Sequence, residues 1–296
     1  MRIAVSHLTR LDYVGDVMEG VMDTRLGPYS DEHQRWLHFE LQAAPNAAVN
    51  RYVDGFGNVA HLVTVRRPHR FLEVTSRGEV ETLLADPFAV PDRAPRGLSA
   101  AEQADYLLPS ALVPADPRLD GMASPFRPRA LEQTFEAVRS LADLVYREFS
   151  YEQRVTDVST TVADVLGTRR GVCQDFAHLL IGLCRAVEIP ARYVSGYIAT
   201  AHLRQSQRLG DMSQTQSHSL EPRRGAEASH AWVEAFTPTH GWRGIDPTNN
   251  LVASEHHVKM AVGRDYRDVS PSRGAYRGAA EERLAVVVRV HPLQPG

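Results

Sequence analysis

The stretch that decides the fold is GVCQDFAHLLIGLCRAVEIPARYVSGYI, residues 171–198. Five of its apolar residues recur at spacings of three or four: Phe176, Leu179, Leu180, Leu183 and Val187. This period predicts an amphipathic helix, and Pro190 follows the helix end because proline cannot continue it. The next residues, ARYVSGYI, are rich in aromatic and β-branched side chains and predict a strand.

Cys173 falls in the first turn of this helix. Unpaired backbone N–H groups and the positive end of the helix dipole favour a thiolate over a thiol at such a position. The other cysteine, Cys184, shares the apolar face with Leu180 and Val187, so we expect it to be a small core residue. The two cysteines are 11 residues apart in the chain. On one helix this places their Cα atoms roughly 16 Å apart, too far for a disulfide.

A thiolate nucleophile needs a base to carry its proton, and the base needs an orienting partner. Two predicted strands supply them, because His230 begins HAWVEAF and Asp246 ends GWRGID. If the turn between them is centred on Pro238, His230 and Asp246 face each other directly, about 5 Å apart at Cβ. A slip of one residue would move them to opposite faces. Either residue alone is weak evidence, but the order Cys, His, Asp on these elements predicts a catalytic triad.

Three regions are expected along the chain. Residues 1–85 contain short predicted strands and the turn signal DGFGN, which predict an all-β sandwich domain. Residues 86–128 hold eight prolines, which exclude a long helix and predict a surface connector. Residues 129–296 form the expected catalytic domain. Its predicted elements are a helix with apolar positions from Leu131 to Phe149, a short helix from Thr161 to Leu166 capped by Ser159 or Thr160, and a last strand with Leu284, Val286, Val288 and Val290 on one face.

Composition restricts the partners. The chain has 33 Lys+Arg against 36 Asp+Glu and a net charge of −3, so nucleic acid and anionic membrane are not expected as partners. No segment approaches the ~20 apolar residues of a membrane span, and the N-terminus MRIAVSHLTR lacks a signal-peptide pattern. With two unpaired cysteines, these features predict a cytoplasmic protein. The polar insertion at residues 201–229 is expected to be a lid, a binding loop or disordered.

Three segments, GVCQDFAHLLIGLCRAVEIPARYVSGYI, SHAWVEAF and GWRGIDPTNN, resemble the core motifs of the transglutaminase-like cysteine enzymes, in the bacterial form with an N-terminal β-domain. The resemblance implies a papain-like α+β core, in which helices pack on an antiparallel sheet. It implies that Cys173 is the nucleophile, His230 the general base and acid, and Asp246 the residue that orients His230. It also implies an upstream aromatic donor to the oxyanion, for which Tyr151 is the candidate. Gly167 stands where a papain-type protease has a glutamine.

Other polar residues have simpler explanations. Asp175 suits the first turn of a helix and is expected to cap it. Asp175 with His178, assisted by residues 255–257, could ligate zinc, but no HExxH or paired CxxC motif supports a metal site. No loop has calcium-ligand spacing, so no metal or other cofactor is expected. Trp232 and Trp242 are expected to cover the catalytic pair and to pack in the sheet.

The motifs predict thiol-dependent acyl transfer on amide or peptide bonds through an acyl-thioester. Hydrolysis of a peptide or protein substrate is favoured, because no feature identifies an amine-acceptor site. Transfer to an amine, as in a protein-glutamine transamidase, is the alternative. A third hypothesis is a non-catalytic peptide-binding module on the same fold. The oligomeric state is not decided by the sequence, and a homo-oligomer is left open.

Overall fold

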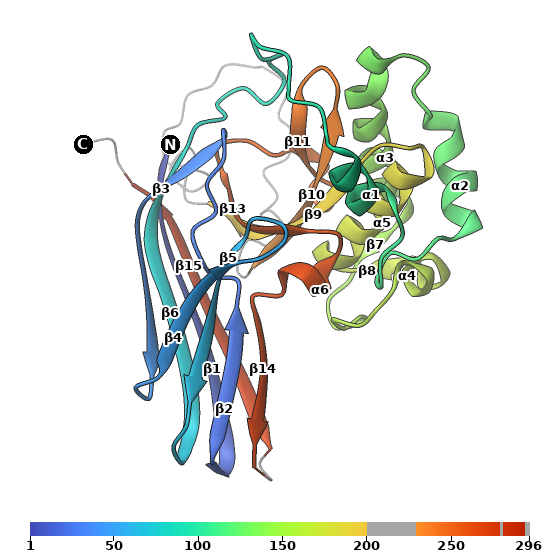
Figure 1. Ribbon diagram of the computed structural model, residues 1–296. Helices are drawn as coiled ribbons and strands as arrows, with labels where there is room; N and C mark the ends of the chain where they lie inside the picture. The colour runs from blue at the N-terminus through green and yellow to red at the C-terminus, as the bar shows by residue number, and fades with distance from the viewer. Residues whose placement is uncertain (200–228, 279–280, 294–296) are drawn as a thin grey trace, which may run out of the picture.

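The computed structural model describes residues 1–199, 229–278 and 281–293. The insertion predicted at 201–229 therefore lies, up to residue 228, outside the described residues. Figure 1 shows a sandwich of long strands on one side of the molecule, a group of helices on the other, and a further sheet between them. The architecture is α+β, with helices packed on an antiparallel sheet and an N-terminal all-β region, which confirms the predicted fold class.

Two four-stranded antiparallel sheets form the sandwich. The first has, in spatial order, β15 (Glu282–Pro292), β1 (Arg2–Val17), β6 (His69–Thr82) and β3 (Gln34–Ala44). The second has β14 (Ser272–Arg277), β2 (Glu19–Thr24), β5 (Val59–Val65) and β4 (Ala48–Val53). Apolar side chains of both sheets meet in a buried cluster: Tyr13, Val17, Met22, Val63, Val65, Leu72 and Val74. Buried and less buried residues alternate along much of β1, as expected for a strand with one face on a core.

The sandwich includes two strands from the end of the chain. β14 and β15 lie within the range 129–296 expected for the catalytic domain, but they pair with β2 and β1. The four-residue apolar face predicted in the last strand is only half covered: Leu284 and Val286 are 63% and 47% exposed, while Val288 and Val290 pack on buried residues. The physical reason is that β1 and β2 each offer an edge of unpaired backbone groups that another strand can satisfy.

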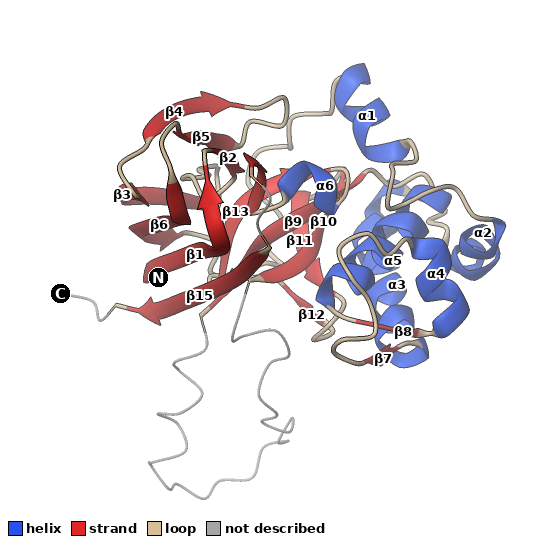
Figure 2. Cartoon of the chain, turned by 90° about the horizontal axis from the view of Figure 1, so that it is seen from below, coloured by secondary structure: helices blue, strands red, loops and turns tan. Residues whose placement is uncertain are grey.

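A five-stranded sheet forms the centre of the second unit. Its strands are, in spatial order, β12 (Leu251–Val252), β11 (Gly241–Asp246), β10 (His230–Thr237), β9 (Ala191–Ile198) and β13 (His257–Gly263). Apolar residues of α3 (Thr134–Glu148), α4 (Val162–Thr168) and α5 (Cys173–Ala186) share one buried cluster with residues of this sheet. Figure 2 shows these helices together on the side of the sheet away from the sandwich. No helix among the described residues is long and apolar enough to cross a membrane.

The remaining elements are short. They are α1 (Ala100–Leu107), α2 (Pro117–Ala123), η1 (Ser124–Phe126), η2 (Leu131–Gln133), β7 (Ser150–Tyr151), β8 (Arg170–Gly171) and α6 (Tyr266–Val269). The Pro-rich connector contains no long helix, but it is more than a surface segment, because Leu112 and Leu119 are fully buried. Leu131, predicted on an apolar face, is 65% exposed because it precedes α3 in η2. The cap of α4 is Thr161, one or two residues later than predicted, in a capping box with Asp164.

The sandwich is fastened to the outer edge of the five-stranded sheet, strand β13. The side-chain amide of Gln34 donates to the carbonyl of Lys259 (2.7 Å) and accepts from its N–H (2.9 Å). The amide of Asn58 does the same at Val262, with both distances 2.8 Å. A side-chain amide has one donor and one acceptor group, so each replaces part of a missing neighbouring strand.

A chain of buried charges crosses the same interface. The Lys259 ammonium pairs with Asp31 of the sandwich (2.5 Å) and with Glu234 of β10. Glu234 also accepts two hydrogen bonds from Arg192 of β9, at 2.6 and 2.8 Å. Burial alone would raise the pKa of Glu234, but the charges of Lys259 and Arg192 lower it to about 2. The network therefore holds neighbouring strands and the sandwich in one arrangement.

Replacing Asn58 with alanine tests the edge contact. Asn58→Ala leaves the N–H and the carbonyl of Val262 without partners in a fully buried place, so we expect the free energy of unfolding to fall by about 2–4 kcal/mol. Urea denaturation measures the change. Asn50→Ala, on the exposed strand β4, is the control and should change stability by less than about 0.5 kcal/mol. Equal effects of the two variants would contradict the role of Asn58.

Candidate active site

Cys173 is the first residue of α5, as the sequence predicts. The turn before it is tight: Asp175 accepts hydrogen bonds from the Val172 N–H (2.8 Å) and the Thr156 hydroxyl (2.7 Å). A Cβ on Gly171 would lie 2.7 Å from the Asp175 carboxylate, so glycine is needed there. Asp175 therefore caps the helix, and Cys173 remains only partly buried.

Cys184 differs from Cys173 in its surroundings. It is fully buried in the cluster between α5 and the sheet. Burial raises the pKa of the Cys184 thiol to about 12, because a thiolate would lose its hydration there. The prediction that Cys184 is a core residue is confirmed.

The structure brings His230 to both Asp246 and Cys173. The Nε2 atom of His230 lies 2.8 Å from Oδ2 of Asp246. The Cys173 side chain acts on the same imidazole as a hydrogen-bond partner and as a charge. Because Nε2 is engaged by the carboxylate, Nδ1 is the ring nitrogen left to face the sulfur; it is buried and makes no hydrogen bond among the described residues. The arrangement places the imidazole between a carboxylate and a thiol.

The register of the hairpin differs from the prediction. Phe236 pairs with Trp242 and Thr237 with Gly241, so the loop is centred on Thr239 and not on Pro238. His230 therefore reaches Asp246 diagonally, since the register places Asp246 two residues from the position opposite His230. The shift is two residues, which keeps both side chains on one face of the sheet. Its cause is Gly241, whose φ of +71° gives a three-residue loop that closes with a left-handed residue.

The Asp246 carboxylate is completely buried and surrounded by donors. Oδ1 accepts the backbone N–H groups of Thr248 (2.9 Å) and Asn249 (3.2 Å). Oδ2 accepts the Asn249 side-chain amide (2.7 Å) in addition to His230. A second imidazole, that of His257, has its Nε2 atom 3.9 Å from Oδ2. Sequence reasoning missed Asn249 as a partner, although its place three residues after an aspartate in DPTNN is typical of an Asx turn.

The charges of this cluster determine the protonation of His230. Burial alone would lower the pKa of the imidazole, but the Asp246 charge and hydrogen bond, followed by those of Cys173, raise it to about 10. Burial would raise the pKa of Asp246, but His230, followed by His257, lowers it well below its usual range. At neutral pH the pair is therefore an imidazolium held by a carboxylate.

Tyr151 lies beside the segment that leads into α5. It belongs to β7, which pairs in parallel with β8, so that Tyr151 is opposite Gly171. Its ring stands edge-on to Phe176, with the centroids 6.2 Å apart. Tyr151, the candidate oxyanion donor, thus pairs with Gly171, which lies two residues before Cys173.

The two predicted tryptophans lie at different ends of the hairpin. Trp232 is buried, with its ring 6.3 Å from His230 and inclined by only 25°. Trp242 lies near the turn, where the Arg192 guanidinium stands 4.1 Å from its ring. The prediction that Trp242 covers the catalytic pair is therefore wrong, because the register pairs Trp242 with Phe236, six residues along β10 from His230. Within the described ranges, no group of three His, Cys, Asp or Glu side chains is placed to hold a metal ion.

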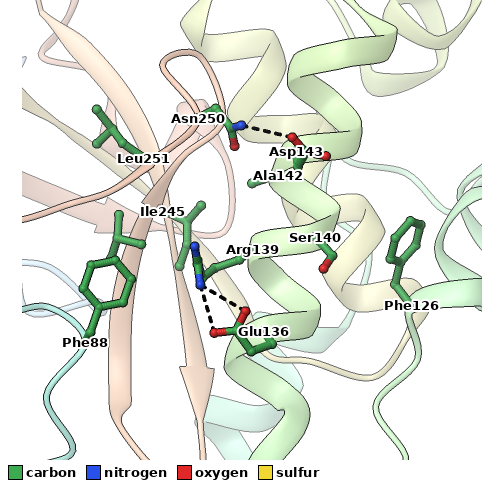
Figure 3. Close-up of a pocket in the computed structure, with 11 residues that line it drawn as sticks. Phe88, Phe126, Glu136, Arg139, Ser140, Ala142, Asp143, Ile245, Asn250 and Leu251 are labelled. Carbon is green, nitrogen blue, oxygen red and sulfur yellow. Dashed lines mark hydrogen bonds and ion pairs between the residues drawn. The ribbon is translucent and has the colours of Figure 1, made fainter. Parts of the chain in front are cut away.

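A cavity of about 600 Å³ lies between α3 and the outer strands of the sheet (Figure 3). Its wall includes Ile245 and Asn250, which flank the loop of Asp246, and Asn250 donates to Asp143 of α3 across it at 3.1 Å. Cys173 and His230 are not among its lining residues. The cavity therefore borders residues next to Asp246 and does not reach Cys173.

Comparisons with known proteins find similar sequences and folds. Residues 123–247 match the family model of the transglutaminase-like superfamily, and residues 3–81 match that of the bacterial transglutaminase-like N-terminal region. The uncharacterized protein ML0607 of Mycobacterium leprae (strain TN) is 32% identical over 295 residues, 99% of each chain. A protein-glutamine gamma-glutamyltransferase of Pseudomonas aeruginosa is 31% identical over 118 residues, which are 38% of this chain and 15% of that protein.

One solved structure is similar over the whole chain. It is named "Putative Cysteine Protease from Cytophaga hutchinsonii" and has a TM-score of 0.76 and 22% sequence identity. The match covers 100% of this chain and 92% of the other. At this level of identity the likeness concerns the fold.

Removing the Asp246 charge should lower the pKa of His230. In Asp246→Asn the raising effect of the carboxylate is lost while burial remains, so we expect a fall of about 1–3 units from about 10. NMR titration of labelled histidines measures it. His178, which burial holds near a pKa of about 4, is the internal control and should not move. An unchanged His230 would contradict the pairing.

The raised pKa of His230 also makes the stability of the protein depend on pH. The pKa of His230 is raised on folding, so its contribution to stability is complete below pH 6.5 and is lost as the pH rises through about 10. Between these limits, the difference in unfolding free energy between the parent protein and Asp246→Asn should shrink as pH increases. If this difference in unfolding free energy grew with pH, the result would contradict a raised pKa for His230.

Proposed function

Because this chain belongs to the transglutaminase-like superfamily, in its bacterial form with an N-terminal β-domain, we propose that it is a cysteine enzyme that transfers acyl groups from amide or peptide bonds. In this proposal Cys173 is the nucleophile, His230 the general base and acid, and Asp246 the residue that orients His230. The observation that carries the proposal is the placement of one buried imidazole between the Asp246 carboxylate and the thiol that begins α5.

The proposed reaction has two halves. In the resting pair the proton of the Cys173 thiol has already passed to Nδ1 of His230. The sulfur attacks the carbonyl carbon as a thiolate, and the C–N bond then breaks as the imidazolium gives this proton to the departing amine. The product is an acyl-thioester. Water or a second amine attacks the thioester, gives its proton to His230 and releases the sulfur. Asp246 stays ionised throughout and stabilises the imidazolium.

The electrostatics support this division of roles. A His230 pKa of about 10 favours an imidazolium at neutral pH, which is the form that can protonate a leaving amine. As first residue of α5, Cys173 has a backbone N–H that no helical carbonyl accepts, and this group can donate to the oxyanion. We assign the second donor to Tyr151, which pairs with Gly171, two residues before Cys173.

Hydrolysis of a peptide or protein substrate is the favoured outcome, and transamidation is the second candidate. No group among the described residues is identified as an amine-acceptor site. The partial similarity to a protein-glutamine gamma-glutamyltransferase favours the second candidate, although it covers only 15% of that protein.

A glutaminyl peptide with a fluorescent primary amine separates the two. We expect free ammonia or cleaved peptide without amine incorporation, and a loss of at least about 10³-fold in turnover for Cys173→Ala. Cys184→Ala is the matched control on the same helix and should keep its activity if the fold is intact. Incorporation of the amine would establish transamidation in place of hydrolysis. Full turnover by Cys173→Ala would overturn the proposed nucleophile.

Alkylation distinguishes an enzyme from a binding module on the same fold. With iodoacetamide, we expect Cys173 to react at least about tenfold faster than Cys184 at pH 6, because the thiolate form is the nucleophile and Cys184 is kept protonated by burial. Peptide mapping by mass spectrometry follows both cysteines in one sample. Equally slow reaction of both would favour the binding module.

A further inference from the structure

A second imidazole stands against the carboxylate that braces His230. The Nε2 atom of His257 lies 3.9 Å from Oδ2 of Asp246, the same oxygen that His230 contacts. We propose that His257 is a positioning residue, which holds the Asp246 carboxylate in the orientation that braces His230 against Cys173. The inference rests on the proposed function, because it assigns a role within the same site.

The hydrogen bonding of His257 determines which ring nitrogen carries the proton. Its Nδ1 atom accepts the backbone N–H of Ser254 at 3.3 Å. A neutral imidazole has one donor and one acceptor nitrogen, so the proton is on Nε2 and the N–H points toward Asp246. At 3.9 Å this contact is longer than a hydrogen bond and acts as a charge–dipole attraction, which is strong where water is excluded. Both groups are buried.

Packing fixes the ring in this place. The His257 ring stands edge-on to Trp232, with centroids 5.3 Å apart and an angle of 74°. Trp232 also lies within 25° of parallel to the His230 ring, with the centroids 6.3 Å apart. The same indole therefore packs against both imidazoles, and both imidazoles face one carboxylate. A ring that only filled space would not need its N–H directed at Oδ2.

The sandwich supports this position through β13. His257 is the first residue of β13, where it pairs with Ile198 of β9. Two residues further along the same strand, Gln34 of the sandwich binds the backbone of Lys259. The position of His257 thus depends on the docking of the N-terminal domain, which gives that domain a role at the site.

The charges around His257 give the positioning role and a purely electrostatic role opposite effects on the pH dependence of Cys173 alkylation. Among the residues that the structure describes, the charged groups facing it include Asp246 and, beyond it, the His230 imidazolium. The neighbouring Lys259 is engaged by Glu234 and Asp31. If His257 acted only as a local positive dipole, its removal would stabilise the imidazolium, and alkylation of Cys173 would extend to lower pH. If it positions Asp246, removal lets the carboxylate turn away, and alkylation of Cys173 would need higher pH.

The experiment measures the pH dependence of iodoacetamide alkylation at Cys173 in the full chain, with no substrate required. In His257→Phe, which keeps a ring against Trp232 but lacks the N–H, we expect the acid limb of the profile to move up by about one pH unit. His257→Gln, which carries an amide N–H at a similar reach, should recover at least half of the shift. His61→Phe is the control, a buried imidazole of the sandwich that stacks on Phe39.

The outcomes separate the hypotheses. An unmoved or lowered acid limb in His257→Phe, with thermal stability reduced as in His61→Phe, would refute the positioning role and leave the proposed function intact. If Cys173 of the parent protein reacts no faster than Cys184, the proposed function fails and the inference with it. If His257→Phe does not fold, His257→Asn, too short to reach Oδ2, replaces it and should show the same upward shift.

Discussion

The interaction on which the site depends is the burial of one carboxylate among fixed donors. An ionised carboxylate without access to water costs several kcal/mol unless it is paired and hydrogen-bonded. Asp246 is 0% exposed, and its oxygens accept two backbone N–H groups, a side-chain amide and the His230 imidazole. The loop after β11 can close only in a form that supplies these donors. Because these donors fix the orientation of the carboxylate, they also fix the position of the His230 ring that it binds.

The second requirement of the proposed site is a thiol that meets this imidazole, and the cap of α5 fixes the position of Cys173. Asp175 binds the Val172 N–H and so fixes where the helix begins. Gly171 lets the chain pass the Asp175 carboxylate, which a Cβ at this position would touch. Both residues act on the backbone next to Cys173, which remains only partly buried. Cys184 lies on the same helix and is fully buried, so the two cysteines differ in their access to water.

Local patterns in the sequence predict much of this structure. The helical period and the position of Cys173 at the start of α5 follow from side chains that are near neighbours in the chain. Local patterns also predict the strands that carry His230 and Asp246, but they do not predict the register in which these strands pair. The left-handed Gly241 decides the loop, and this conformation is not evident from TPTHG alone. What the sequence does not reveal is contact between distant segments: the return of β14 and β15 to the sandwich, and the approach of His257 to Asp246.

The buried ion network explains how the register of the sheet is kept despite these weak local signals. His230, Trp232 and Glu234 share one face of β10, while Ala231 and Val233 face the cluster around α5. A slip of one residue would turn Glu234 into that apolar cluster and leave Arg192 and Lys259 without their shared partner. Leaving a buried charge unpaired costs about 3–5 kcal/mol, more than most single packing contacts supply. The network can thus add little net stability and still exclude the arrangements in which His230 and Asp246 do not meet.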